Sequence, residues 1–367
     1  MIILRLLAFV GGSFLVLYTF LSAARTFVLP RNASVKLTWL VFIMVRRLFN
    51  WLMKGLRTYE QKDELMAMYA PVSLLLMVPV WLLVTTLGYA FMFWALGVEP
   101  LSRAFVLSGS SVLTLGFAQT DTLLQTILVF TEATIGLILV AMLISYLPTM
   151  YAAFSKREMA VSLLEVRAGL PPTAPELVWR LYGLNRDPEA FQAFWQSWES
   201  WFAEIEESHT SLAALVFFRS PRPHQSWVKA AGVVLDAAAL YQSVAQNPPS
   251  LHPTLTIRAG VLALQRIAEM FRVPFNEDPH FPQDSIHISR EEFDAAVDRL
   301  ISQGVPVKSD RELAWRNFAG WRVNYDSVLL ALSHLTMAPT APWLSDFTFV
   351  PPDPSSGETA GKLKRIR

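Results

Sequence analysis

The residues of this chain best suited to chemistry lie in one short polar stretch between two long apolar runs. The stretch Ser111-Val112-Leu113-Thr114-Leu115-Gly116-Phe117 combines hydroxyl side chains with a glycine. Non-helical backbone is tolerated at membrane depth only where it is buried in protein or lines a watery cavity. As an extended strand, Thr114, Leu115, Gly116 and Phe117 would offer four carbonyl oxygens and one hydroxyl as hard ligands for a dehydrated monovalent cation. Gly116 matters because carbonyls that all point one way require backbone angles closed to residues with a β-carbon.

The composition predicts an all-α membrane protein. Apolar residues make up 53% of the 367 residues and charged residues 17%, and the mean hydropathy is +0.35, all unusual for a soluble domain of this size. A net charge of +1 and the lack of a basic face with interleaved aromatics argue against a nucleic-acid partner. Because the chain has no cysteine, disulfides, thiolate chemistry and cysteine-based zinc sites are excluded.

Three apolar runs are each long enough to cross a bilayer, which needs about 20 residues in a helix. They cover residues 2–24, 69–98 and 123–154. The first run contains Arg5, which is close enough to its end to reach the interface. A cleaved signal peptide ending near Ser22-Ala23-Ala24 is the alternative for this run.

The basic residues between the first two spans predict the topology. Residues 25–68 carry many more Lys and Arg than acidic residues, which favours a cytoplasmic location for this loop. We therefore expect a multi-pass protein of the cell (inner) membrane, with its N-terminus outside and its C-terminus cytoplasmic. Lys156 and Arg157, directly after the third span, agree with this topology.

An amphipathic helix is predicted within the basic loop. Its apolar residues recur at helical spacing, at Leu37, Leu40, Val41, Met44, Leu48, Trp51 and Leu52, and its polar side carries Arg46, Arg47, Asn50, Lys54 and Arg57. Such a helix can lie in the inner membrane interface and attract anionic lipid. A solvated face packed on the cytoplasmic part is the alternative, because helical periodicity does not separate the two.

A short helix is expected to begin at Pro100 and end at about Leu113. Proline suits the first helical position, where its missing N–H costs nothing. The partial negative charge at the other end of the helix favours a cation. Ser110 and Ser111 are placed to hydrogen-bond the turn that leaves the helix.

The order span, short helix, Thr-x-Gly-aromatic, span resembles the pore module of potassium channels. The resemblance covers residues 69–154: an outer helix 69–98, a pore loop 99–122 and an inner helix 123–154. It implies a bacterial potassium-channel-like homotetramer, because one loop per chain cannot close a filter, with Thr114, Leu115, Gly116 and Phe117 as its filter. Phe117 would pack outward against the short helix.

The chain departs from the family after Phe117. Potassium filters continue with Gly-Asp, whereas this chain has Ala118-Gln119, which bears directly on ion selectivity. The expected function is passive conduction of a monovalent cation, potassium by resemblance, with no cofactor and no metal beyond the permeating ion. A loop that plugs the fold without conducting, in a membrane-anchored scaffold or sensor, is the alternative. No acid–base or metal constellation suggests an enzyme.

Three residues of the third span are candidates for functional roles. Glu132 is an intramembrane carboxylate, which is costly and therefore a functional candidate; we expect it to support the filter through Ser108, Ser110 or Thr114, to be held protonated, or to reach interfacial water. Gly136 suits either a hinge or close helix packing. Pro148 removes a backbone hydrogen bond, so we expect a kink there near a gate.

The remainder is predicted to be a helical cytoplasmic domain, residues 155–338, and a disordered tail, residues 339–367. An aromatic stripe is expected to be core: Phe191, Phe194, Trp195, Trp198 and Phe202. Ser289 and Glu292 form a plausible capping box. No dinucleotide-binding or Walker motif is present and the histidines lack paired metal spacing, so the cytoplasmic partner or ligand remains unknown.

Overall fold

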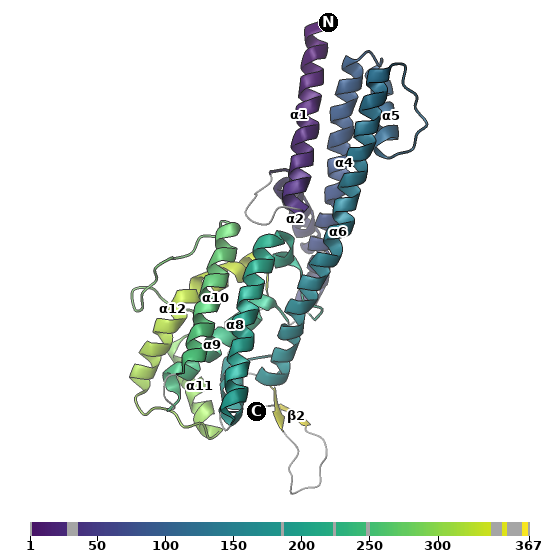
Figure 1. The fold of residues 1–367 in the computed structure, drawn as a ribbon. Helices are drawn as coiled ribbons and strands as arrows, with labels where there is room; N and C mark the ends of the chain where they lie inside the picture. The colour runs from purple at the N-terminus through teal and green to yellow at the C-terminus, as the bar shows by residue number, and fades with distance from the viewer. Residues whose placement is uncertain are drawn as a thin grey trace. The chain divides into compact units, whose positions relative to one another are not determined.

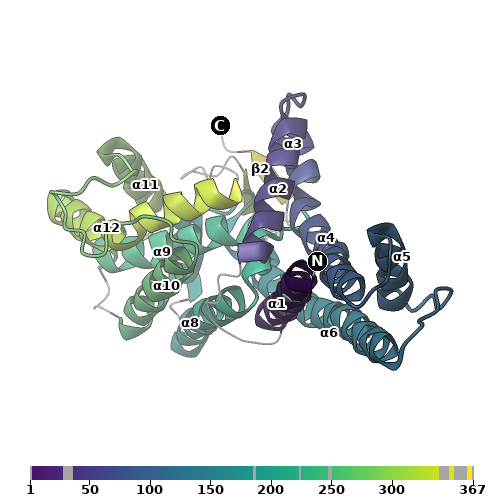
Figure 2. The ribbon, with the colours of Figure 1, turned by 90° about the horizontal axis from the view of Figure 1, so that it is seen from above.

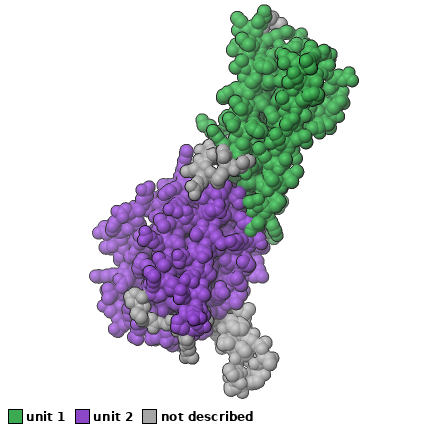
Figure 3. Space-filling view, in the orientation of Figure 1, with its two compact units in different colours: residues 1–152 green, residues 153–367 purple. Residues whose placement is uncertain are grey.

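The computed structural model describes residues 2–27, 36–184, 187–222, 225–246, 250–338, 347–350 and 362–365. The chain divides into two compact units, residues 1–152 and 153–367 (Figure 3). In the described part, three helical segments are long and apolar enough to cross a membrane: Ile2–Phe27, Glu60–Ala95 and Leu123–Ala168. The prediction of an all-α protein with three such helices is confirmed.

Helices α1 (Ile2–Phe27) and α4 (Tyr69–Ala95) pack side by side in the first unit (Figures 1 and 2). Their backbones meet at two glycines: a β-carbon at Gly12 would overlap the carbonyl oxygen of Gly88, and one at Gly88 would overlap the side chain of Val16. Small residues at such a crossing let two helices approach closely. Helix α4 ends three residues earlier than predicted.

The end of α4 is set by a glycine. Gly97 has a φ of +94°, in the left-handed region that favours glycine. The amide of Val98 donates to the carbonyl of Phe93 and that of Gly97 to the carbonyl of Trp94, each at 3.1 Å. This arrangement satisfies the last carbonyls of the helix and turns the chain out of it.

Two shorter helices lie between α1 and α4 in the sequence. Helix α2 (Lys36–Met53) confirms the helix predicted in the basic loop, and it packs against α4. Helix α3 (Tyr59–Ala67) begins after Thr58, whose side chain accepts a hydrogen bond from the amide of Gln61. Such a cap satisfies one of the free amides at the start of a helix.

Helices α5 (Leu101–Val112) and α6 (Leu123–Ala168) flank the polar stretch. Pro100 is the N-cap of α5, so the predicted short helix is confirmed to within one residue at each end. Helix α6 is much longer than the predicted inner span, because no break occurs at residue 154. It continues through Pro148, the one residue in this stretch without an amide hydrogen to donate.

The second unit is a bundle of helices around α9 (Trp227–Val244), which is buried on nearly all sides. The helices after α6 are α7 (Ala174–Leu184), α8 (Pro188–Ser211), the 3₁₀ turn η1 (Ala213–Phe217), α10 (Leu251–Met270), α11 (Arg290–Ser302) and α12 (Arg311–Thr336). The predicted aromatic stripe of α8 is buried in the core, and the predicted capping box opens α11.

A buried arginine joins α6 to the end of α8 and to the η1 turn that follows it, within the second unit. Arg157 donates to the carbonyl oxygens of Leu215 and Phe218, at 2.9 and 2.7 Å, and forms an ion pair with Glu158. One guanidinium nitrogen also lies 3.2 Å from Nε2 of His209. Because arginine has donors only, Nε2 accepts from it and the imidazole is neutral.

Two short antiparallel strands are described within the range for which the sequence predicts disorder. Strand β1 (Phe347–Val350) pairs with β2 (Lys362–Arg365), with Phe347 opposite Arg365. These eight residues therefore differ from the prediction. The rest of range 339–367 lies outside the described residues.

Candidate functional site

The polar stretch leaves α5 in a tight turn and not as the extended strand that the sequence predicts. Helix α5 ends at Val112 with Leu113 as its C-cap. Thr114 and Gly116 then both adopt positive φ, +56° and +72°. A left-handed conformation is rare for a β-branched residue, so Thr114 is a strained position. The hydrogen bonds made by the amide groups of the loop explain the turn.

Four successive amide groups converge on Ser110. The amides of Leu115 and Gly116 donate to its carbonyl oxygen, at 2.8 and 3.4 Å. Those of Phe117 and Ala118 donate to its hydroxyl oxygen, at 3.1 and 3.3 Å. Ser110 therefore binds the loop with both its main chain and its side chain, which confirms the turn-binding role predicted for it.

The orientation of four carbonyl groups follows from these hydrogen bonds. In a trans peptide unit the C=O of one residue and the N–H of the next point in opposite directions. Because the amides of residues 115–118 point toward Ser110, the carbonyl groups of residues 114–117 point away from it. The four oxygens predicted as cation ligands therefore all face away from Ser110, on the outer side of the turn, although the backbone is not extended.

The side chains of this loop are turned outward. Leu113, Leu115 and Phe117 are 53%, 60% and 65% exposed, so the prediction that Phe117 packs against the short helix is wrong for the single chain. The hydroxyl of Thr114 donates to the neighbouring carbonyl of Leu113 at 2.8 Å. Three large apolar side chains are thus exposed beside the loop carbonyl groups. An exposed apolar patch of this kind marks a site of contact with another molecule.

The C-terminal end of α5 is fastened to α6 at two points. The hydroxyl of Ser111 donates to the carbonyl oxygen of Val129 at 2.8 Å. Gly136 stands directly beneath the carbonyl of Val112, in a space that a β-carbon would overfill. The side chain of Ser111 therefore positions the helix from which the loop starts, while its carbonyl oxygen accepts a hydrogen bond from the amide of Thr114 at 2.9 Å. For Gly136, close packing alone accounts for the glycine.

Glu132 is buried behind the same helix and makes contact with Ser108. Its carboxyl group shows no exposed surface, which rules out the interfacial water considered from the sequence. Its Oε1 and the hydroxyl of Ser108 are hydrogen-bonded, and that hydroxyl lies 2.9 Å from the carbonyl oxygen of Thr86. Of the three partners predicted for Glu132, the structure brings only Ser108 to it. The other oxygen, Oε2, has no hydrogen-bond partner among the described residues.

The hydroxyl of Ser108 lies between two oxygen atoms, Oε1 of Glu132 and the carbonyl oxygen of Thr86. The carbonyl of Thr86 accepts only, and the hydroxyl of Ser108 has one proton to give. If Ser108 donates to Thr86, its oxygen must accept from Glu132, which requires a protonated carboxyl group. A neutral carboxyl is also far less costly to bury. The chain Glu132–Ser108–Thr86 thus ties α6, α5 and α4 together.

Gln125, which the sequence reading did not single out, holds the segment that follows the loop. Its Oε1 accepts from the amide of Asp121 at 2.9 Å, and its Nε2 donates to the carbonyl of Leu96 at 3.3 Å. A polar residue in the first turn of an apolar span was the available signal. Asp121 in turn contacts Arg103 of α5 at 3.4 Å, so the return from the loop is attached at both sides.

Arg5 of α1 forms an ion pair with Glu99, immediately before α5. The sequence predicts that Arg5 reaches toward the interface; in the structure its guanidinium group meets the carboxylate of Glu99. Both side chains are part-exposed, so the pair contributes at most about 1 kcal/mol. Its effect is positional: it holds the N-terminal turn of α1 against the start of the loop region.

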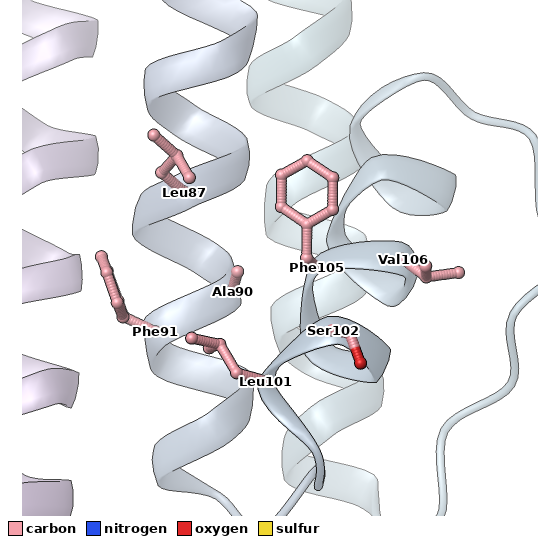
Figure 4. A pocket seen from close by; sticks show the side chains of 7 residues that line it. All are labelled: Leu87, Ala90, Phe91, Leu101, Ser102, Phe105 and Val106. Atoms are coloured by element: carbon pink, nitrogen blue, oxygen red, sulfur yellow. The ribbon is translucent and has the colours of Figure 1, made fainter.

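An apolar groove of about 390 Å³ opens between α4 and α5 (Figure 4). Its lining is apolar apart from the hydroxyl of Ser102, which leaves nothing to ligate an ion or fix a polar substrate; the lining residues are Leu87, Ala90, Phe91, Leu101, Ser102, Phe105 and Val106. No group of three or more His, Cys, Asp or Glu side chains among the described residues is arranged to hold a metal.

Comparison of the chain with protein-family models, with curated proteins and with solved structures gave no match.

Proposed function

We propose that several copies of this chain assemble into a membrane channel that conducts monovalent cations passively. The observation that carries the proposal is the convergence of four amides on Ser110. It turns the carbonyl groups of Thr114, Leu115, Gly116 and Phe117 away from Ser110, toward the outer side of the loop. Rows of carbonyl oxygens are how proteins replace the hydration shell of a permeating cation.

The charge distribution around the loop favours a cation over an anion. Helix α5 ends at Val112, immediately before the carbonyl row. The C-terminal end of a helix carries a partial negative charge that favours a cation. The left-handed Thr114 fits the same picture, because strained backbone of this kind is retained where the surrounding structure imposes it and clusters at functional sites.

The exposed side chains of the loop argue for an oligomer. Leu113, Leu115 and Phe117 project from the single chain with more than half of each side chain exposed. One loop offers ligands from one side only, so a ring of copies is needed to surround an ion. Four copies follow from the resemblance of residues 69–154 to the potassium-channel pore module, which also makes potassium the expected ion and Pro148 a candidate gate.

The expected setting is the cell membrane, with the C-terminal unit in the cytoplasm. The basic residues of 25–68 favour this orientation. Ala118 and Gln119 stand where potassium filters have Gly-Asp, so we expect weaker discrimination between potassium and sodium than a complete filter gives.

The proposal is tested by thallium influx into proteoliposomes that contain the purified full-length protein. Gly116→Val should abolish influx without preventing membrane insertion, because a β-branched residue strongly resists a φ of +72°. Gly109→Ala is the matched control: it lies on the same segment, has open space for a β-carbon and is helical. We expect thallium influx through the parent protein and through the Gly109→Ala variant. We expect none through Gly116→Val.

Two outcomes would refute the proposal. If the Gly116→Val protein conducts as the parent does, the loop is not the path of the ion. If the parent protein shows no thallium, rubidium or sodium flux, a non-conducting scaffold or sensor, acting through its cytoplasmic helices, becomes the better account.

A further inference from the structure

Helix α2 uses only one of its faces to pack on the rest of the first unit. The buried residues recur every fourth position, at Val41, Val45, Phe49 and Met53. This stripe faces α4, which is the main contact of α2 in the structure. The packed stripe covers roughly a third of the helix circumference, so the other faces need a separate explanation.

A second apolar face of α2 is exposed. It follows helical spacing beside the packed stripe and comprises Leu40, Met44, Leu48, Trp51 and Leu52, which are 42%, 59%, 50%, 66% and 41% exposed. We call this set the apolar arc. Isolated apolar residues on a surface need no explanation, but a contiguous patch of five large ones marks an interaction site.

Basic residues border the apolar arc on its other side. Arg47 and Lys54 are seven positions apart, which places them on one edge of the helix, and both are exposed. Lys36, at the start of the helix, lies on the same edge and is also exposed. Long basic side chains can lay their methylene stems along an apolar surface while their charged ends reach outward.

The position of α2 relative to α1 and α4 indicates what the apolar arc meets. The hydroxyls of Thr26, in the last turn of α1, and Thr38, in the first turn of α2, are 2.8 Å apart. The hydroxyl of Tyr69, the first residue of α4, donates to the carbonyl of Phe42 at 3.2 Å. Arg46 stacks on the ring of the same Tyr69, 5.9 Å from its centre.

These contacts hold α2 at the level where two membrane helices end. Helix α1 finishes at Phe27 and α4 starts at Tyr69, and the packing of Gly12 on Gly88 makes the two helices neighbours. A helix attached to both of these ends lies at the boundary between hydrocarbon and water. Trp51 on the apolar arc suits that level, where tryptophan is enriched.

We propose that α2 lies in the plane of the inner membrane interface and binds anionic phospholipid. The apolar arc enters the acyl region, and Arg47, Lys54 and Lys36 engage negatively charged headgroups. Charge complementarity selects this occupant: a basic edge beside an apolar face is the pattern of interfacial helices that bind acidic lipid. The inference concerns membrane attachment and does not depend on ion conduction.

The depth of the apolar arc is tested with nitroxide spin labels in the full-length protein. Because the chain has no cysteine, Met44→Cys and Asn50→Cys each create a unique labelling site, one on the apolar arc and one on the polar side. In vesicles that contain an acidic phospholipid, the label at 44 should be more accessible to oxygen than to a water-soluble nickel chelate. The label at 50 should show the reverse order.

Two results would overturn the membrane assignment. A label at 44 that the nickel chelate reaches as readily as the label at 50 would show that the apolar arc faces water. A label at 44 that neither reagent reaches, with spin–spin broadening between chains, would show that a second copy covers the arc.

The lipid charge is tested separately, by the preference of the protein for spin-labelled phosphatidylglycerol over spin-labelled phosphatidylcholine. Each of Arg47→Gln and Lys54→Gln should lower that preference, roughly fivefold for a fully engaged charge. Arg103→Gln, which removes an exposed basic residue of α5, should leave it unchanged. An equal preference in the parent and in all three variants would refute the anionic headgroup site, whatever the depth of the arc.

Discussion

Gly136 of α6 lies directly against the carbonyl oxygen of Val112, the last residue of α5, with no room for a β-carbon between the two helices. The loop that carries the candidate ligands starts two residues later. The packing of Val112 on Gly136 therefore fixes the position of the loop carbonyl groups relative to α6. Any change that separates α5 from α6 should displace these carbonyl groups.

Gly136→Ala should destabilise the protein. Alanine normally stabilises an open helical position relative to glycine by up to ~1 kcal/mol, but here overpacking against Val112 should cost ~1–3 kcal/mol. The thermal midpoint of the purified protein in detergent should fall. Gly11→Ala is the control, since a β-carbon at Gly11 of α1 meets nothing. A rise in the midpoint for Gly136→Ala would favour the hinge hypothesis, which needs no close contact.

Ser110→Ala should impair conduction more than it impairs folding. The variant keeps the carbonyl that binds the amides of Leu115 and Gly116 but loses the hydroxyl that binds those of Phe117 and Ala118. We expect a loss of ~1–2 kcal/mol in stability and a clear fall in thallium influx or in the potassium-to-sodium flux ratio. Ser102→Ala, at an exposed position of the same helix, should change neither. Parental flux and ion ratio in Ser110→Ala would mean that this hydroxyl does not orient the loop.

Glu132→Gln should behave like the parent protein, whereas Glu132→Ala should be markedly destabilised. An amide can donate to the oxygen of Ser108 as a protonated carboxyl does, so that Ser108 still donates to Thr86. Alanine leaves a cavity and an unpaired hydroxyl, at a cost of ~2–4 kcal/mol. The infrared band of a protonated carboxyl should be present in the parent and lost in Glu132→Gln. Its absence from the parent would contradict the assigned proton.

Stability should decline as the pH falls below the ordinary pKa of histidine, and His209 should account for part of that decline. Burial, reinforced by the charge of Arg157, lowers the pKa of His209 well below its ordinary value of 6.5. Below that value the unfolded chain binds a proton that the folded chain does not, so the folded state loses up to ~1.4 kcal/mol per pH unit; above it this group has no effect.

The measurement is the unfolding free energy of the full-length protein between pH ~7.5 and ~5.5, across the histidine range. His209→Gln keeps an acceptor for Arg157. It should reduce the slope of the unfolding free energy against pH by the contribution of about one proton. Equal slopes in the parent and in His209→Gln would show that His209 gains a proton in the folded state.

The elements were largely predictable because local signals specify them. Apolar runs of sufficient length located the three long helices, and Pro100 marked the start of α5 to within one residue. The capping box of Ser289 and Glu292 correctly predicted the start of α11. The extension of α6 to residue 168 was less visible, since its hydropathy falls after residue 154 while its helical spacing does not.

The geometry of the loop was only partly predictable. The type and position of Ser110 suggested a side chain that binds the turn, but not that its carbonyl would collect two further amides and force Thr114 into a left-handed conformation. Contacts between residues far apart in the sequence were also not visible in the local sequence pattern. The roles of Gln125 at Leu96 and of Arg5 at Glu99 depend on residues at least 29 positions away, which periodicity and capping patterns cannot register.

The most direct test of the ion-binding loop is a cryo-electron microscopy map of the full-length protein in lipid nanodiscs with potassium. The account predicts a ring of copies in which the carbonyl oxygens of Thr114, Leu115, Gly116 and Phe117 surround ion density on the symmetry axis. A single protomer, or a ring in which those four oxygens face away from the axis, would contradict it.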